Sequence, residues 1–152
     1  MNIETKAMGT VSVDDNSVLH FSHGLYGFED YTEFVLLESE YKPFMWLQSV
    51  KEKALAFLVV DPFLFFTDYE IDVDDQSVRD IGVKSPADVC IIVIITLAKE
   101  KKLSLTLTAN LQGPLVINKN NRAAKQVVLA DPRWLTKHDL NLNNAQNRSS
   151  SC

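Results

Sequence analysis

Hydrophobic and polar residues alternate along much of the chain, which is the pattern of β-strands with one buried face. Residues 103–108 alternate leucine with serine or threonine, and residues 68–74 alternate apolar side chains with acidic ones. Two stretches, 55–60 and 89–97, are apolar at nearly every position and rich in branched side chains, which favours strands covered on both faces. Shorter candidates are 9–13, 18–21, 33–37, 44–49, 115–118 and 125–129. About ten short strands predict a mainly β fold, an antiparallel, barrel-like single domain.

Turn signals separate these strands, and helical signals are sparse. Asp14 to Asn16 predicts the turn of a hairpin, and Pro62 and Pro132 end strands because proline has no N–H for a ladder. One short helix is expected over 74–81, with Asp74 or Asp75 as its N-cap and Gly82 as its stop. A second candidate covers 27–32. The chain is therefore expected to contain one or two short helices.

Length and composition indicate one domain followed by a tail. The chain has 152 residues, of which 46% are hydrophobic, and this is enough for one core. Residues 141–152 contain four asparagines, three consecutive serines and few apolar side chains. We therefore expect a β-barrel domain over 1–140 and a disordered tail over 141–152.

Charge and targeting signals narrow the class of protein. The formal net charge is −5 and the pI about 5.1, which disfavours nucleic acids and anionic membranes and suits a basic partner. The N-terminus lacks the apolar core of a signal peptide, and the longest apolar run, 89–98, is too short for a membrane helix. Two cysteines, Cys90 and Cys152, are too few for a disulfide framework or a metal cage. A cytoplasmic protein without nucleic-acid or membrane binding is expected.

Catalytic and cofactor motifs are absent from the sequence. It contains no P-loop, no Gly-x-Gly-x-x-Gly, no Gly-x-Ser-x-Gly and no His-Glu-x-x-His. His20 and His23 would point to opposite faces of a strand and its exit, so they do not predict a metal site. Gly24 to Gly27 has the spacing of an RNA-binding Gly-x-x-Gly clamp, but acidic residues follow it. We therefore predict no enzyme, no cofactor and no metal.

Acidic residues are concentrated between positions 68 and 80, where Arg79 is the only cation. A calcium loop starting at Asp68 would place Val73 at its sixth position and Arg79 at its twelfth, and neither residue fits. Two interpretations stay open: a charged surface that protects a strand edge, or an acidic docking surface for a basic protein. The aromatic residues just before it, Phe63, Phe65 and Phe66, fit either ordinary core packing or an apolar binding patch.

Five segments, in order along the chain, resemble the motifs of one family. They are FSHGLYGF at 21–28, FMWLQSV at 44–50, LAFLVVDPFLFFTDY at 55–69, NLQGPLVIN at 110–118 and KQVVL at 125–129. Each is similar to a block of the flagellar assembly factor FliW family, and together they span nearly the whole of 2–140. Gly113 stands where the family usually has alanine, and Tyr26 where it usually has proline. Neither difference removes a polar function.

The resemblance implies a regulator without catalysis, built on a β-barrel-like fold. Proteins of this family bind flagellin in the cytoplasm and also bind CsrA, a small basic RNA-binding dimer that represses flagellin translation. Abundant flagellin occupies the family member and leaves CsrA free. Once flagellin is exported, the released protein captures CsrA, lowers its RNA affinity allosterically and relieves repression.

From the charges we hypothesise a binding surface for the basic partner. Its electrostatic rim would be formed by five acids, and its apolar anchors by the three nearby phenylalanines: Asp68, Glu70, Asp72, Asp74, Asp75, Phe63, Phe65 and Phe66. A monomer is expected, since no heptad pattern is present. The alternatives are a small carboxylate-dependent hydrolase, which would need acids with raised pKa values in a pocket, and a ligand-binding β-barrel, which would need an internal cavity.

Overall fold

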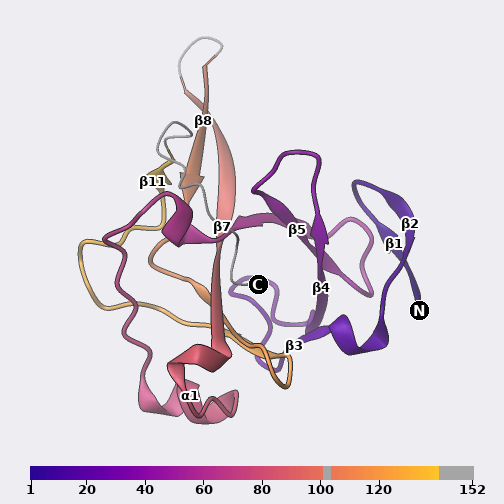
Figure 1. Cartoon of the computed structure of the whole chain (residues 1–152). Coiled ribbons are helices and arrows are strands. Elements are labelled where there is room, and N and C mark those ends of the chain that lie inside the picture. Colours follow the sequence, from indigo (N-terminus) through magenta and orange to yellow (C-terminus); the bar gives the residue numbers. More distant parts are fainter. Residues whose placement is uncertain (101–103, 141–152) are drawn as a thin grey trace.

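Short strands follow one another along the chain, with little helix between them (Figure 1). The computed structural model describes residues 1–100 and 104–140. The strands are β1 (Asn2–Thr5), β2 (Gly9–Ser12), β3 (Leu19–Phe21), β4 (Glu33–Glu38), β5 (Met45–Ser49), β6 (Ala56–Val60), β7 (Val89–Glu100), β8 (Ser104–Ala109), β9 (Leu115–Asn118), β10 (Ala123–Gln126) and β11 (His138–Asp139). The helix α1 covers Asp75–Asp80, and three single 3₁₀ turns are η1 (Asp15–Ser17), η2 (Pro62–Leu64) and η3 (Pro86–Asp88).

Seven strands close into a barrel. Their order is β7-β6-β5-β4-β3-β10-β9, and β9 pairs again with β7. All these neighbours are antiparallel except β3 and β10, which run parallel. The predicted mainly β, barrel-like fold is confirmed, and the parallel pair corrects its fully antiparallel form. A closed barrel of these seven strands cannot alternate direction at every neighbour, because the number of strands is odd, so one neighbouring pair has to run parallel.

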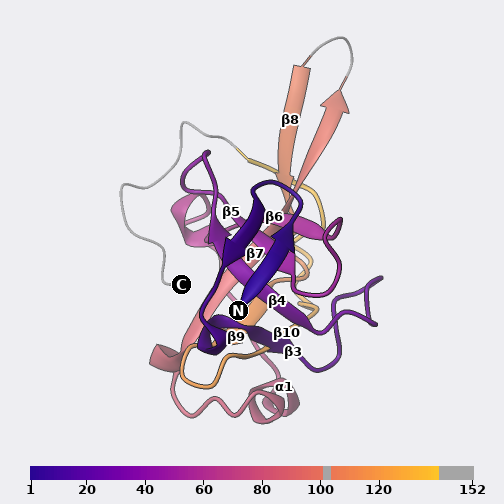
Figure 2. The same ribbon diagram turned by 90° about the vertical axis from the view of Figure 1, so that its right-hand side faces the viewer.

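β7 is the longest strand and has two neighbours on one edge. Residues 89–92 pair with β9, and the part from Ile95 onward pairs with β8. Between these two pairings, residues 110–114, which connect β8 to β9, lie opposite only two residues of β7, Val93 and Ile94. β8 and β9 therefore form one edge that is interrupted by a bulge. The outer ends of β7 and β8 project from the barrel as a hairpin, and β11 pairs with β8 (Figure 2).

The barrel interior is filled by apolar side chains. Every barrel strand contributes at least one buried residue: Leu19, Phe21, Phe34, Leu47, Val59, Cys90, Ile92, Leu115, Ile117 and Ala124. A second core lies outside the barrel, on the opposite faces of β6, β7 and β9, where the segments 61–83 and 127–140 cover it. This explains why 55–60 and 89–97 are apolar at both alternating sets of positions, because each of these strands has a core on both faces.

A third, small core lies beneath the β1–β2 hairpin, where Ile3 packs on Val18 and Val35. The two strands form a separate sheet, so β2 does not continue into β3. The predicted hairpin turn at Asp14 to Asn16 is therefore wrong. Asp14 instead accepts a hydrogen bond from the Asn16 N–H and caps η1, because a short aspartate side chain suits a 3₁₀ start as well as a hairpin turn.

The expected helix over 74–81 is confirmed as α1, with Asp74 as its N-cap and Gly82 at a φ of +69° just after its end. The second candidate, 27–32, is wrong. That region forms tight turns with an isolated bridge between Leu25 and Phe28. Gly24 and Gly27 adopt positive φ values of 65° and 87°, which reverse the chain before a helix can begin.

Most predicted strands lie within one or two residues of their observed bounds, but four regions differ, of which the acidic stretch 68–74 is described with the candidate surface below. β1 and β11 were not anticipated, and the strand expected over 125–129 ends at Gln126. Beyond it, the N–H groups of Val127 and Leu129 donate to Pro114 and Gln112, an irregular pairing outside the ladder. The disorder predicted for 141–152, and position 103 of the predicted 103–108 strand, lie outside the described residues. No helix within residues 1–100 and 104–140 is long and apolar enough to cross a bilayer.

Candidate protein-binding surface

The acidic segment, residues 68–75, connects η2 to α1 along the outside of the molecule (Figure 1). Its apolar members point inward: Tyr69 is 4% exposed, and Ile71 and Val73 are half-buried. All five predicted rim acids are exposed: Asp68, Glu70, Asp72, Asp74 and Asp75. The predicted period of two is present, but the predicted strand is wrong. The segment forms no ladder with any described strand. Its alternation comes from packing its inner face on the second core, which needs no partner strand.

Tyr69 fastens the segment to the second core. Its hydroxyl donates to the Leu111 carbonyl oxygen at 2.5 Å, and its ring meets that of Trp134 edge to face at a centroid distance of 4.9 Å. Burial raises the pKa of Tyr69 above its ordinary value, so the hydroxyl stays protonated and keeps donating. The start of the acidic segment is therefore held in place by a buried aromatic contact.

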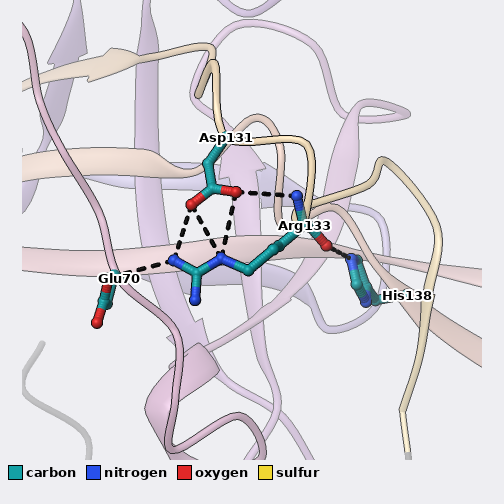
Figure 3. Close-up of polar contacts among 4 residues, drawn as sticks. All are labelled: Glu70, Asp131, Arg133 and His138. Carbon is teal, nitrogen blue, oxygen red and sulfur yellow. Dashed lines mark hydrogen bonds and ion pairs between the residues drawn. The ribbon is translucent and has the colours of Figure 1, made fainter.

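Glu70 is tied to the C-terminal region through Arg133 (Figure 3). The Arg133 guanidinium donates to Glu70 at 3.2 Å and to Asp131 at 2.7 Å, and it lies 4.9 Å from the centre of the Trp134 ring. His138 contacts the Arg133 carbonyl oxygen through Nε2 at 3.0 Å. Hydrogen bonds from Arg133 lower the pKa of Asp131. Because these ions are exposed, the contact orients the segment more than it stabilises the fold.

Asp74 has a local structural role. Its carboxylate accepts hydrogen bonds from the Ser77 hydroxyl at 2.6 Å and the Ser77 N–H at 3.1 Å, which caps α1. Both bonds lower the pKa of Asp74. Within the described part of the chain, by contrast, no ion pair or side-chain hydrogen bond involves Asp68, Asp72 or Asp75. Of the five rim acids, these three keep their full charge available to another molecule.

An apolar groove of about 480 Å³ adjoins the acidic segment. Its lining comes from the segment itself, from α1 and the chain after it, and from the outer faces of β7 and β9: Phe63, Ile71, Val73, Val78, Ile81, Val83, Lys84, Ser85, Pro86, Val89, Ile91 and Val116. Asp72 lies between two lining residues in the chain, Ile71 and Val73, and its own side chain is exposed. Only Lys84 and Ser85 contribute polar side chains to the lining. An open apolar groove bordered by acids is the form of a protein-binding surface.

The three predicted phenylalanine anchors occupy different environments. Phe63 is half-buried and lines the groove, so it adjoins the rim acids. Phe65 is only 8% exposed and stacks on Phe44 at a centroid distance of 6.0 Å, within the core. Phe66 is half-buried and meets the ring of His138. The structure thus brings Phe63 to the acidic surface and places Phe65 beneath it.

Residues from the second half of the chain complete this surface, and local sequence patterns hardly indicate them. Arg133 and Trp134 reach the acidic segment from more than sixty positions away. Val78 and Val83 line the groove only because α1 folds back over β7 and β9. The one local sign of this contact in the sequence is Trp134, which follows the Asp131-Pro132 turn. It indicates burial but not which segment covers it.

The competing interpretations find no support in the described residues. Every carboxyl group there whose pKa clearly departs from its ordinary value is lowered, whereas a catalytic general acid needs a raised pKa: Glu29, Asp74, Asp80 and Asp131. The barrel interior holds packed side chains where a ligand would have to sit. Among residues 1–100 and 104–140, no cluster of three or more His, Cys, Asp or Glu is arranged to hold a metal ion.

Comparison with known proteins covers almost the entire chain. The family model described as FliW protein matches residues 2–140. A flagellar assembly factor FliW from Treponema denticola is 46% identical over 140 residues, which is 92% of this chain and 93% of that protein. One from Treponema pallidum is 42% identical over 149 residues, 98% and 97% of the two chains. A crystal structure of the flagellar assembly factor FliW superposes with a TM-score of 0.83 at 38% identity, covering 94% of this chain and 99% of that one.

Proposed function

The chain belongs to the FliW family of flagellar assembly factors, and we propose that it works by binding two proteins in turn, flagellin and the translational regulator CsrA. It acts in the cytoplasm, as a monomer and without catalysis. While flagellin is plentiful it occupies this protein and CsrA stays free to repress flagellin translation. After flagellin is exported, this protein sequesters CsrA and translation resumes. Family membership supports the flagellar role, and the surface chemistry supports the basic partner.

The observation that carries the proposal is the acidic segment beside the apolar groove. Asp68, Asp72 and Asp75 are exposed and have no cationic partner in the described residues. Such charges attract a basic protein over roughly 10 Å at about 0.1 M salt, and this attraction acts mainly on the association rate. Exposed ion pairs contribute only about 1 kcal/mol or less, so affinity has to come from apolar side chains buried on binding. Phe63 lies where such burial would occur.

Isothermal titration with purified CsrA and with flagellin, at about 0.05 and 0.3 M salt, tests the proposal. We expect binding to each partner, mutual competition, and weaker CsrA binding at the higher salt. The informative variant is Asp72→Lys with Asp75→Lys, which reverses two unpaired rim charges and leaves the Asp74 cap in place. Its matched control is Asp30→Lys with Glu40→Lys, which changes net charge equally at exposed positions outside the acidic segment.

The rim variant should bind CsrA more weakly and lose most of the salt dependence, while the control should behave like the unaltered protein. Equal weakening by both variants would mean that net charge alone matters and that the acidic segment is not the docking surface. Binding to neither partner by the unaltered protein would reject the proposed function itself.

A further inference from the structure

The acidic segment combines a strand-like sequence with an unpaired backbone. Four of its residues, 70–73, form no backbone hydrogen bond within the described part of the chain, through either N–H or C=O. Their side chains nevertheless alternate between solvent and the outer core, as they would in a sheet. Strand-like backbone whose N–H and C=O groups have no partner within the protein can form hydrogen bonds with a further strand.

The chemistry beside this backbone restricts what can pair with it. A second copy of the same segment would place acids opposite acids, which is unfavourable in cross-strand pairs. A strand carrying Lys or Arg would instead face Asp72 with an opposite charge. The Arg133 guanidinium on Glu70 shows that the same acidic face accommodates a cation. On the other side, the groove lined by Ile71, Val73 and Val83 accommodates aliphatic side chains.

We propose that residues 70–73 bind their partner by strand addition: an extended segment of a basic protein, alternating Lys or Arg with Val, Ile or Leu, pairs with this backbone. Its cationic side chains face Asp72 and its neighbours, and its aliphatic side chains enter the groove. Main-chain hydrogen bonds supply affinity, and the alternation supplies selectivity. The inference rests on the proposed function in that CsrA is the basic partner, but the mode of contact is a separate claim with its own test.

Amide hydrogen exchange measured by NMR distinguishes strand addition from contact through side chains alone. In the free protein the amides of residues 70–73 should exchange rapidly, because nothing in the described chain accepts from them. With CsrA bound, every second amide should become protected, either 70 and 72 or 71 and 73, because alternate N–H groups of a strand point to the same edge. Bound CsrA with no new protection at any of these four amides would overturn the inference and leave the proposed function intact.

A pair of synthetic peptides tests the inference without CsrA. Capped Lys-Val-Lys-Val-Lys-Val has the required alternation, and its isomer Lys-Lys-Lys-Val-Val-Val has the same composition and charge. The alternating peptide should bind roughly tenfold more tightly, since two or three cross-strand pairs form only in that order. If CsrA fails to bind, but the alternating peptide is preferred and protects alternate amides of residues 70–73 when it binds, the proposed function is rejected and strand addition is retained. Equal affinity of the two peptides would overturn strand addition whatever CsrA does.

Discussion

Two glycines in one turn offer a matched test of how the chain is built between β3 and β4. Gly24 and Gly27 both have positive φ, 65° and 87°, so replacing either with alanine imposes the same kind of backbone penalty. Their surroundings differ. A Cβ on Gly24 would lie 2.5 Å from the Glu29 Cα and 2.7 Å from its carbonyl oxygen, whereas a Cβ on Gly27 would meet nothing within 4 Å.

These distances set the expected magnitudes. The left-handed conformation costs an alanine roughly 1–2 kcal/mol, of which a reduced unfolded-state entropy offsets about 0.4–1 kcal/mol. Gly27→Ala should therefore destabilise the protein by about 0–1.6 kcal/mol. Gly24→Ala must also open its closest contact from 2.5 Å to the 3.4 Å at which ordinary packing begins, against backbone atoms that cannot rotate away. Such overpacking adds typically about 1–3 kcal/mol.

Urea unfolding followed by tryptophan fluorescence measures both variants against the unaltered protein. The dependence of the free energy of unfolding on urea concentration, the m-value, should be the same in both variants. Gly24→Ala should lower the free energy of unfolding by about 2 kcal/mol more than Gly27→Ala does. In thermal unfolding that difference corresponds to about 4–8 °C for a chain of this size. Equal losses in the two variants would refute the reasoning, because they would show that the Glu29 backbone moves aside freely and that only the φ angle matters.

Three further predictions follow from contacts around the acidic segment. Tyr69→Phe removes the buried hydrogen bond to Leu111 and should lower the free energy of unfolding by about 1 kcal/mol, while Tyr26→Phe, at a residue 63% exposed, should leave it unchanged in the same urea titration. The pKa of Asp74 is lowered in the folded state, so its stabilising contribution is present at neutral pH and is lost as the pH falls below about 4 and through the folded-state pKa. Asp74→Asn, which preserves an N-cap, should therefore show a smaller loss of stability between pH 6 and pH 3 in urea unfolding, and an unchanged loss would mean that the carboxylate charge is not what Ser77 stabilises. Arg133→Gln should leave Glu70 without its cation and make CsrA binding more salt-dependent, while the free energy of unfolding stays the same. An unchanged salt dependence would show that Arg133 does not reduce the charge of the acidic surface.

Local patterns predicted most strands and the helix α1 correctly, because each depends on neighbours in the chain. The two-sided apolar runs at 55–60 and 89–97 became β6 and β7, with a core on each face. Asp74 caps α1 through a contact three residues away, which sequence spacing specifies directly. The Gly-x-x-Gly spacing at Gly24 to Gly27 forms a tight turn, in which both glycines adopt positive φ values that other residues rarely take.

Errors arose where the outcome depends on which segment becomes a neighbour. Apolar and acidic residues alternate over 68–74 as regularly as in any strand of the chain, yet this segment lies outside the described ladders. A strand needs a hydrogen-bonding partner, and the alternation of residues does not specify which segment that partner is. Asp14 to Asn16 carries turn residues, but β2 and β3 enter different sheets, so no hairpin closes there. The strand β11 has two residues and forms only because β8 lies beside it.

The candidate surface shows the same division. Its charge is local, and the sequence by itself determined that five exposed acids would gather between residues 68 and 75, since alternation separates them from Tyr69, Ile71 and Val73. Only the tertiary structure decided that Arg133 would pair with Glu70 and that Phe65 would be buried while Phe63 lines a groove. It also decided that the backbone of residues 70–73 would find no hydrogen-bond partner among residues 1–100 and 104–140. Periodicity is a property of adjacent residues, whereas pairing, burial and access depend on contacts between segments far apart in the chain, which no local pattern specifies.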